Sequence, residues 1–127
     1  MILPALKRGK YTAESQFHLG TRLGGGKHIV DVVARNNANE AFLISLKWQQ
    51  TSGTAEQKVP FEVICLIDAL ETNSPAYKSA YLVLGGSGWK LRDFYTKGGL
   101  DRFLHYKDLV KILTLEDFVA KANYGKL

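Results

Sequence analysis

Two runs of aliphatic and β-branched residues dominate the first half of the chain. Residues 28–35 read HIVDVVAR and residues 41–48 read AFLISLKW, and both compositions favour extended backbone. The residues between them, 36–40, read NNANE, and asparagine tolerates the backbone conformations of tight turns. The pattern predicts two adjacent antiparallel strands. A further strand is expected over residues 17–23, ending at the three glycines of residues 24–26.

After residue 53 the apolar positions change from a strand-like to a helix-like period. Thr54 is a candidate N-cap, with Gln57 at the spacing of a capping box. Pro60 lies inside the pattern, so the helix is expected either to bend there or to begin there. Asn73-Ser74-Pro75 is expected to end it. The apolar residues that share one helical face are Val59, Val63, Leu66, Ile67 and Leu70.

The second half of the chain alternates short strands with helical segments. Strands are expected over residues 81–84 and 111–114, a helix over 115–122, and a helical segment over 91–106 that breaks near Gly98-Gly99. This order predicts an α/β protein with a mixed β-sheet flanked by helices.

Composition changes this picture only slightly. With 127 residues, 46% hydrophobic and 23% charged, the chain is expected to form a single globular domain over residues 1–127. Its formal net charge of +5 weakly favours an anionic partner. The one cysteine, Cys65, lies in an apolar run and is expected to be a small buried hydrophobe. One thiol forms no internal disulfide, and no apolar run is long enough to span a membrane, so an intracellular location is expected.

Two charged residues lie within the two confident strands. If residues 36–40 form the turn, the numbers of paired residues sum to 76, which places Asp31 opposite Ser45 and one step from Lys47. Charges among apolar strand residues are costly unless they are paired or bind something. One interpretation is a buried Asp31–Lys47 ion pair. The other is a catalytic pair, because a carboxylate can hold Mg²⁺ and a lysine can stabilise a phosphate.

The segments around this pair resemble the core of the PD-(D/E)XK nucleases, the superfamily that includes type II restriction enzymes. The resemblance is carried by residues 19–33 (LGTRLGGGKHIVDVV) and 44–50 (ISLKWQQ), where a strand-borne Asp is followed on the next strand by x-Lys. Residues 52–58 and 113–118 are similar to the helix start and the closing strand and helix of that fold. The similarity extends over residues 17–122.

The resemblance implies a restriction-endonuclease-like core and divalent-metal-dependent cleavage of DNA, with Mg²⁺ or Mn²⁺ as the cofactor. Asp31 would bind the metal. Lys47 would stabilise the attacking water or the phosphate.

The sequence departs from the superfamily pattern at Ser45, where an Asp or Glu is usual. A subgroup of restriction enzymes has Ser-x-Lys and takes its second acid from the next helix, so Ser45 would then act beside the metal ligands. Glu56 and Glu62 are the candidates for that acid, and both border the apolar helical face. Glu62 better matches the spacing of the subgroup. Glu56 lies within the superfamily-like segment and is slightly preferred.

A second departure concerns the N-terminus, where the superfamily fold begins with a helix that often carries a Glu. Sixteen residues precede residue 17, and they include Pro4 and Gly9, so this helix is expected to be short or missing. Glu14 is not expected to take the role of that acid. A homodimer or a partner subunit would then complete the fold.

Further positions are candidates for contact with the substrate. They are Gln49, Lys58, Lys90 and Arg92. The basic residues Lys90, Arg92, Lys97, Arg102 and Lys107 alternate with Trp89, Tyr95 and Tyr106, as in surfaces that bind a DNA backbone. A solvated helix face explains the same pattern equally well. Gln49 is alternatively an edge glutamine, and Trp48 is expected to lie in the core.

Two other functions remain compatible with the sequence. A catalytically inactive relative would bind DNA without cutting it, if the acid lost at position 45 has not been replaced. An assembly or interaction module that reuses the fold would bind neither DNA nor metal.

Overall fold

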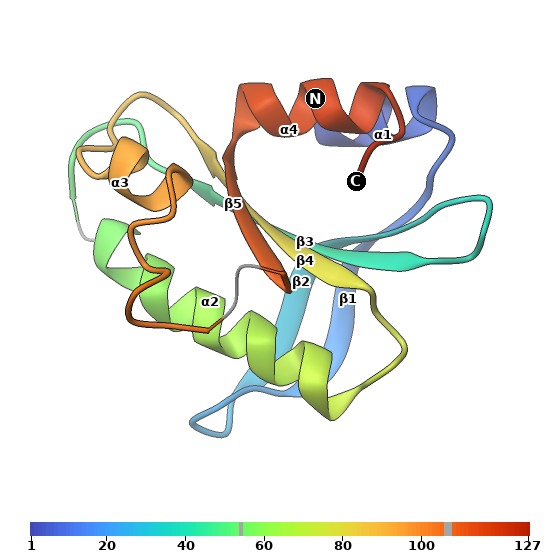
Figure 1. Ribbon diagram of the computed structural model, residues 1–127, viewed down its shortest axis with the longest axis horizontal. Helices are drawn as coiled ribbons and strands as arrows, with labels where there is room; N and C mark the ends of the chain where they lie inside the picture. The colour runs from blue at the N-terminus through green and yellow to red at the C-terminus, as the bar shows by residue number, and fades with distance from the viewer. Residues whose placement is uncertain (54, 106–107) are drawn as a thin grey trace.

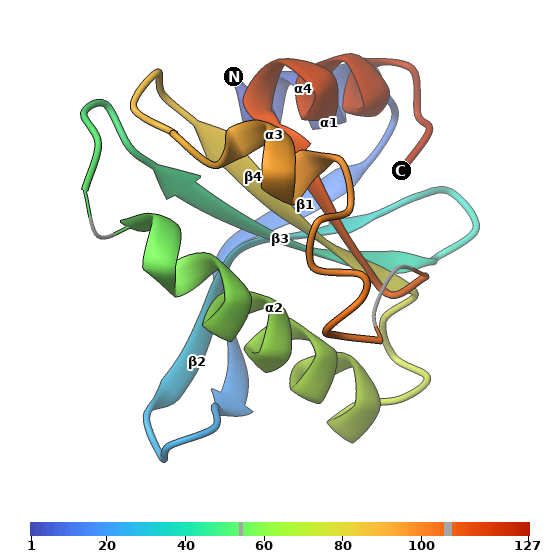
Figure 2. The same ribbon diagram turned by 60° about the vertical axis from the view of Figure 1, so that its left-hand side comes forward.

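A mixed five-stranded sheet, with helices on both of its faces, forms the centre of the protein (Figures 1 and 2). The computed structural model describes residues 1–53, 55–105 and 108–127. The strands are β1 (Thr12–Thr21), β2 (Lys27–Arg35), β3 (Ala41–Trp48), β4 (Ser79–Gly85) and β5 (Val110–Thr114). They lie side by side in chain order. The pairs β1–β2 and β2–β3 are antiparallel, and the pairs β3–β4 and β4–β5 are parallel.

The helices cover both faces of this sheet. They are α1 (Ile2–Arg8), α2 (Ala55–Thr72), α3 (Arg92–Thr96) and α4 (Leu115–Asn123). Figure 1 shows α2 on one face, and α1 and α4 together on the other. The expected α/β architecture with flanking helices is confirmed. Within the described ranges, no helix has the length and apolarity needed to cross a membrane.

Each face of the sheet has its own hydrophobic core. The core under α2 includes Val33, Leu43, Val63, Leu66 and Leu82. The core under α1 and α4 includes Leu6, Phe42, Ile44, Tyr81 and Phe118. Successive residues of β3 alternate between the two cores, as the side chains of a central strand must.

The predicted register of the first antiparallel pair is confirmed. Val32 lies opposite Ile44, and Arg35 lies opposite Ala41, so the paired numbers sum to 76. The turn chemistry fixes this register, because the Asn36 side chain accepts from the backbone N–H of Ala38 and the Asn39 backbone is left-handed (φ 65°).

Two segments differ from the sequence-based expectations, and the N-terminal helix agrees with the expectation that it is short or missing. β1 begins at Thr12 rather than at residue 17, because exposed polar residues extend the hairpin beyond the apolar core. The segment expected to be helical over residues 91–106 contains only the short α3, with Tyr106 and Lys107 outside the described residues. The N-terminal helix is present but short. It packs against α4 so closely that a side chain at Gly9 would overlap the carbonyl oxygen of Ala122.

Pro60 neither ends α2 nor marks its start, since the helix runs from Ala55 across the proline. The proposed N-cap, Thr54, lies outside the described residues. Proline has no N–H, so the carbonyl of Glu56, four residues earlier, loses its helical donor. The hydroxyl of Tyr95 donates to that carbonyl at 2.7 Å. Burial, together with the nearby Glu56 carboxylate, raises the pKa of Tyr95, which keeps this donor protonated.

This compensation predicts a coupling between Tyr95 and Pro60. Tyr95→Phe leaves the buried Glu56 carbonyl without a donor and should lower the free energy of unfolding by about 1–3 kcal/mol. In a Pro60→Ala background residue 60 has its own N–H, so the same Tyr95→Phe change should cost less. Urea unfolding of the four proteins measures the difference. Tyr124→Phe, at a residue 78% exposed, is the control. An equal cost in both backgrounds would mean that Tyr95 stabilises the fold by packing alone.

Candidate active site

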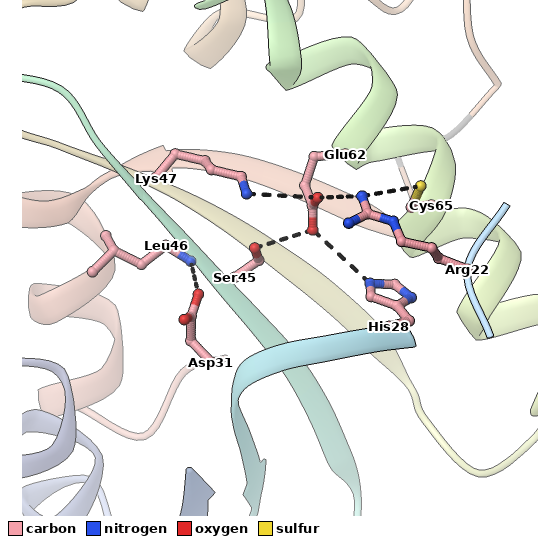
Figure 3. A network of polar contacts seen from close by, with 8 residues as sticks. All are labelled: Arg22, His28, Asp31, Ser45, Leu46, Lys47, Glu62 and Cys65. Atoms are coloured by element: carbon pink, nitrogen blue, oxygen red, sulfur yellow. Dashed lines mark hydrogen bonds and ion pairs between the residues drawn. The ribbon is translucent and has the colours of Figure 1, made fainter. Parts of the chain in front are cut away.

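The carboxylate of Glu62 is the centre of a buried polar cluster between α2 and the sheet (Figure 3). Glu62 is only 6% exposed, because α2 turns it toward β3 beside the core residues Val59 and Val63. The Ser45 hydroxyl donates to Oε1 of Glu62 at 3.2 Å. The Lys47 ammonium lies 3.7 Å from Oε2. The structure therefore brings together three of the residues singled out in the sequence.

Two more cationic or titratable groups contact the same carboxylate. Nη2 of Arg22 lies 3.5 Å from Oε2, and Nε2 of His28 lies 4.0 Å from Oε1. Arg22 reaches α2 because Gly24 and Gly25, both left-handed, close the tight turn between β1 and β2. Neither residue was predicted as part of the site. Their position in the segment that resembles the superfamily core was the one available signal.

Asp31 approaches the end of β3 from β2. Its Oδ2 accepts a hydrogen bond of 2.6 Å from the backbone N–H of Leu46, just beyond the last paired residues of the two strands. Val30 belongs to the core under α2, whereas Val32 belongs to the opposite core, so side-chain alternation is interrupted at Asp31. Gln16, in the gap of the β1 register opposite Asp31, is left-handed (φ 52°). Such irregularities redirect a strand side chain. A strict alternation of side chains along β2 does not predict this change in the direction of the Asp31 side chain.

The alternative of a buried Asp31–Lys47 ion pair does not describe this arrangement. Within the described part of the chain, the carboxylate that pairs with Lys47 is Glu62, and Asp31 bonds to a backbone amide instead. Lys47 keeps 32% of its side chain exposed. Its ammonium is therefore accessible to a ligand.

The carboxylate of Glu56 forms its hydrogen bonds outside this cluster. Its Oε1 accepts from the backbone N–H groups of Lys90 and Leu91, the latter at 2.9 Å, and the residue is 8% exposed. These bonds join the start of α2 to the loop before α3. The slight preference for Glu56 over Glu62 is therefore not supported, because Glu62 is the glutamate that contacts Ser45 and Lys47.

The other candidates occupy different surroundings. Gln49 is buried rather than at an edge. Its side-chain amide donates to the Gly88 carbonyl at 2.8 Å and so fixes the loop that contains Gly88. Trp48 is 58% exposed, which contradicts its expected place in the core. Its ring covers Gly85, where a Cβ would lie 2.5 Å from Cε3 of the indole. Glu14 is exposed on β1.

The remaining basic candidates lie on the surface. Lys58 is exposed on α2, and Lys90 and Arg92 are exposed before and at the start of α3. Arg92 and Lys97 both approach the carboxylate of Asp93, at 4.0 and 3.8 Å. Lys107 lies outside the described residues.

The donor set of this site suits a hydrated oxygen-liganded ion. Asp31 and Glu62 contact three consecutive residues of β3, at the Leu46 amide and at the Ser45 and Lys47 side chains. Mg²⁺ and Mn²⁺ commonly take one or two protein carboxylates and retain water. No group of three or more His, Cys, Asp or Glu side chains in the described ranges is arranged to hold an ion. Among the residues that the structure describes, Asp31 and Glu62 are the carboxylates in contact with residues 45–47 of β3.

The burial of His28 gives the cluster a pH dependence. Burial lowers the pKa of His28, 3% exposed, below its ordinary value, and the nearby Glu62 carboxylate does not compensate. At a pH between the folded-state pKa and the unfolded-state pKa of His28, this residue is protonated in the unfolded chain but not in the folded protein. Stability should be full above about pH 6.5 and fall as the pH drops toward the lower folded-state pKa. Urea unfolding across this range should show that His28→Gln flattens the slope, whereas His18→Gln, at an exposed residue, leaves it unchanged. An unaltered slope in His28→Gln would assign the dependence to other groups.

Comparisons with known proteins bear on the family and the fold of the chain. A sequence model of the PD-(D/E)XK nuclease superfamily domain matches residues 3–126. No curated protein matches the chain. The crystal structure of a protein of unknown function, AF1548, is similar in fold, with a TM-score of 0.57 and 11% sequence identity. The similarity covers 90% of this chain but 54% of AF1548, so the chain spans about half of that protein.

The match to the superfamily covers nearly the whole chain, and the mixed sheet with its flanking helices is the fold that the resemblance implied. The chain belongs to the PD-(D/E)XK nuclease superfamily.

Proposed function

We propose that this protein is a divalent-metal-dependent endonuclease that hydrolyses phosphodiester bonds of DNA. The observation that carries the proposal is the contact of Glu62 with both Ser45 and Lys47. The superfamily pattern usually has an acid two residues before the lysine, and serine is a poor metal ligand. Glu62 places a carboxylate at that serine, so two acids, Asp31 and Glu62, contact residues 45–47 of β3.

Asp31 and Glu62 would bind the metal, Mg²⁺ or Mn²⁺. A bound divalent ion offsets negative charge on the reacting phosphate and lowers the pKa of a bound water. Ser45 donates to Glu62 and so fixes the orientation of its carboxylate. The accessible ammonium of Lys47 would contact a phosphate oxygen or orient the attacking water.

Exposed basic residues near the start of α2 and before α3 support a nucleic-acid substrate. The Glu56 side chain joins the start of α2 to residues 90 and 91, so Lys58 lies on the segment next to Lys90 and Arg92. All three side chains are exposed. Exposed cations on adjacent segments can bind successive phosphates of a DNA backbone.

The central test compares the two glutamates. Supercoiled, branched and single-stranded DNA should be cleaved with Mg²⁺ or Mn²⁺, and Glu62→Gln should lower the rate at least about a hundredfold through loss of transition-state stabilisation. Asp31→Asn and Lys47→Ala should do the same. Glu56→Gln is the matched control, because it removes the same charge from the same helix while keeping an acceptor for the Lys90 and Leu91 amides. It should remain active.

Other outcomes would identify the alternatives. DNA binding without cleavage on any substrate would indicate an inactive relative that only binds DNA. A lack of both DNA and metal binding would indicate an assembly module. Loss of cleavage in Glu56→Gln with activity retained in Glu62→Gln would overturn the assignment of the second acid.

We further propose that a homodimer or a partner subunit supplies the second site needed to cut both strands of a duplex. Light scattering at the concentration of the cleavage assay should then give a mass above the 14.1 kDa of one chain whenever linear product forms. A monomeric mass with efficient double-strand cutting would rule this out.

A further inference from the structure

We propose that Arg22 is a substrate-binding residue that pairs with Glu62 in the metal-free protein and transfers to a DNA phosphate when metal and substrate bind. This inference rests on the proposed function, and it assigns a role to a residue that the superfamily motif does not include. It concerns the guanidinium of Arg22, in the turn between β1 and β2, and its contact with Oε2 of Glu62 (Figure 3).

The charges around Glu62 are the first support. Arg22 and Lys47 both lie against Oε2, at 3.5 and 3.7 Å, while Ser45 and His28 lie against Oε1. One carboxylate therefore faces two permanent cations. A divalent cation bound to Glu62 would be repelled by both at short range in a partly buried site. Arg22 and the metal therefore compete for the same carboxylate.

The weak attachment of Arg22 is the second support. Its contacts to Glu62 Oε2 (3.5 Å) and Cys65 Sγ (3.6 Å) are both long and use the same nitrogen, Nη2. Its buried Nε has no partner among the described residues. A guanidinium offers five N–H donors, and among the described residues the side-chain contacts of Arg22 use Nη2 alone. The group rests over the ring of Phe61, 5.5 Å from its centroid.

These features suit an arginine that exchanges partners. A guanidinium binds phosphate through two parallel hydrogen bonds, and such bonds are stronger than the single long contact to Glu62. One third of the Arg22 side chain is exposed, so a phosphate can reach it. Because Arg22 and Lys47 meet at one oxygen of Glu62, both can contact the same phosphodiester group.

The test measures metal and DNA binding separately. Mn²⁺ binding without DNA is measured by calorimetry, and binding of a duplex oligonucleotide in Ca²⁺ by fluorescence anisotropy. Arg22→Gln should bind Mn²⁺ about tenfold more tightly, since a competing charge is gone, and should bind DNA about tenfold more weakly. Arg22→Lys keeps the charge but not the paired donors, so its Mn²⁺ affinity should stay near wild type while its DNA affinity falls.

The matched control is Arg35→Gln, which removes the same charge at the opposite end of β2 from His28. Thermal unfolding of each variant verifies that it is folded. Weaker Mn²⁺ binding in Arg22→Gln would overturn the proposal, because it would show that Arg22 only positions Glu62. Unchanged DNA affinity in Arg22→Gln would overturn it as well.

The outcome also separates this inference from the proposed function. If the wild-type protein binds neither Mn²⁺ nor DNA, the proposed function fails and the role of Arg22 fails with it. If the wild-type protein binds both and Arg22→Gln alters neither affinity, the role of Arg22 alone fails.

Discussion

The burial of one carboxylate, that of Glu62, is the constraint that organises this end of the molecule. A carboxylate removed from water is unstable unless nearby cations and donors replace its hydration. Glu62 obtains them from two separate segments, the turn after β1 and the end of β3. These contacts depend on three features together: the position of α2 over the sheet, the tight glycine turn and the short β2–β3 ladder.

The topology explains why these segments meet. β2 is antiparallel to β3, so Asp31, which precedes the paired residues of β2, lies beside Leu46 near the end of β3. β3 is parallel to β4, and the connection between them passes through α2, which carries Glu62 over the same end of the sheet. Ligands of open α/β sheets bind beyond the carboxyl ends of parallel strands. The candidate site lies where the carboxyl end of the parallel strand β3 meets the antiparallel β1–β2 hairpin.

The fold was predictable where local chemistry determines it. The asparagine-rich turn fixed the β2–β3 register, and the period of the apolar residues located α2. Glu56 and Glu62 could not be distinguished in this way, because both border the apolar helical face at similar angles. The difference lies in what each glutamate faces, which is the loop at residues 90 and 91 for Glu56 and the end of β3 for Glu62.

Arg22 and His28 were missed for a related reason. Arg22 is 40 residues from Glu62 in sequence, so no local spacing links the two. Trp48 was placed in the core because large aromatic residues usually lie there, yet it is 58% exposed beside Gly85. The side chains of β2 cease to alternate between the two faces of the sheet at Asp31. The valine-rich sequence around Asp31 contains no local pattern that predicts this.

The contacts of Glu56 have a consequence for the rotation of α2 about its own axis. Its side chain accepts from two backbone amides, and its carbonyl accepts from Tyr95, so the first turn of the helix is held to residues 90, 91 and 95. Successive helical residues differ by about 100°. A rotation of that size would take Glu62 away from Ser45 and Lys47. The bonds of Glu56, which take no part in the site, therefore act together with the packing of Val59 and Val63 to set the direction in which the helix presents Glu62.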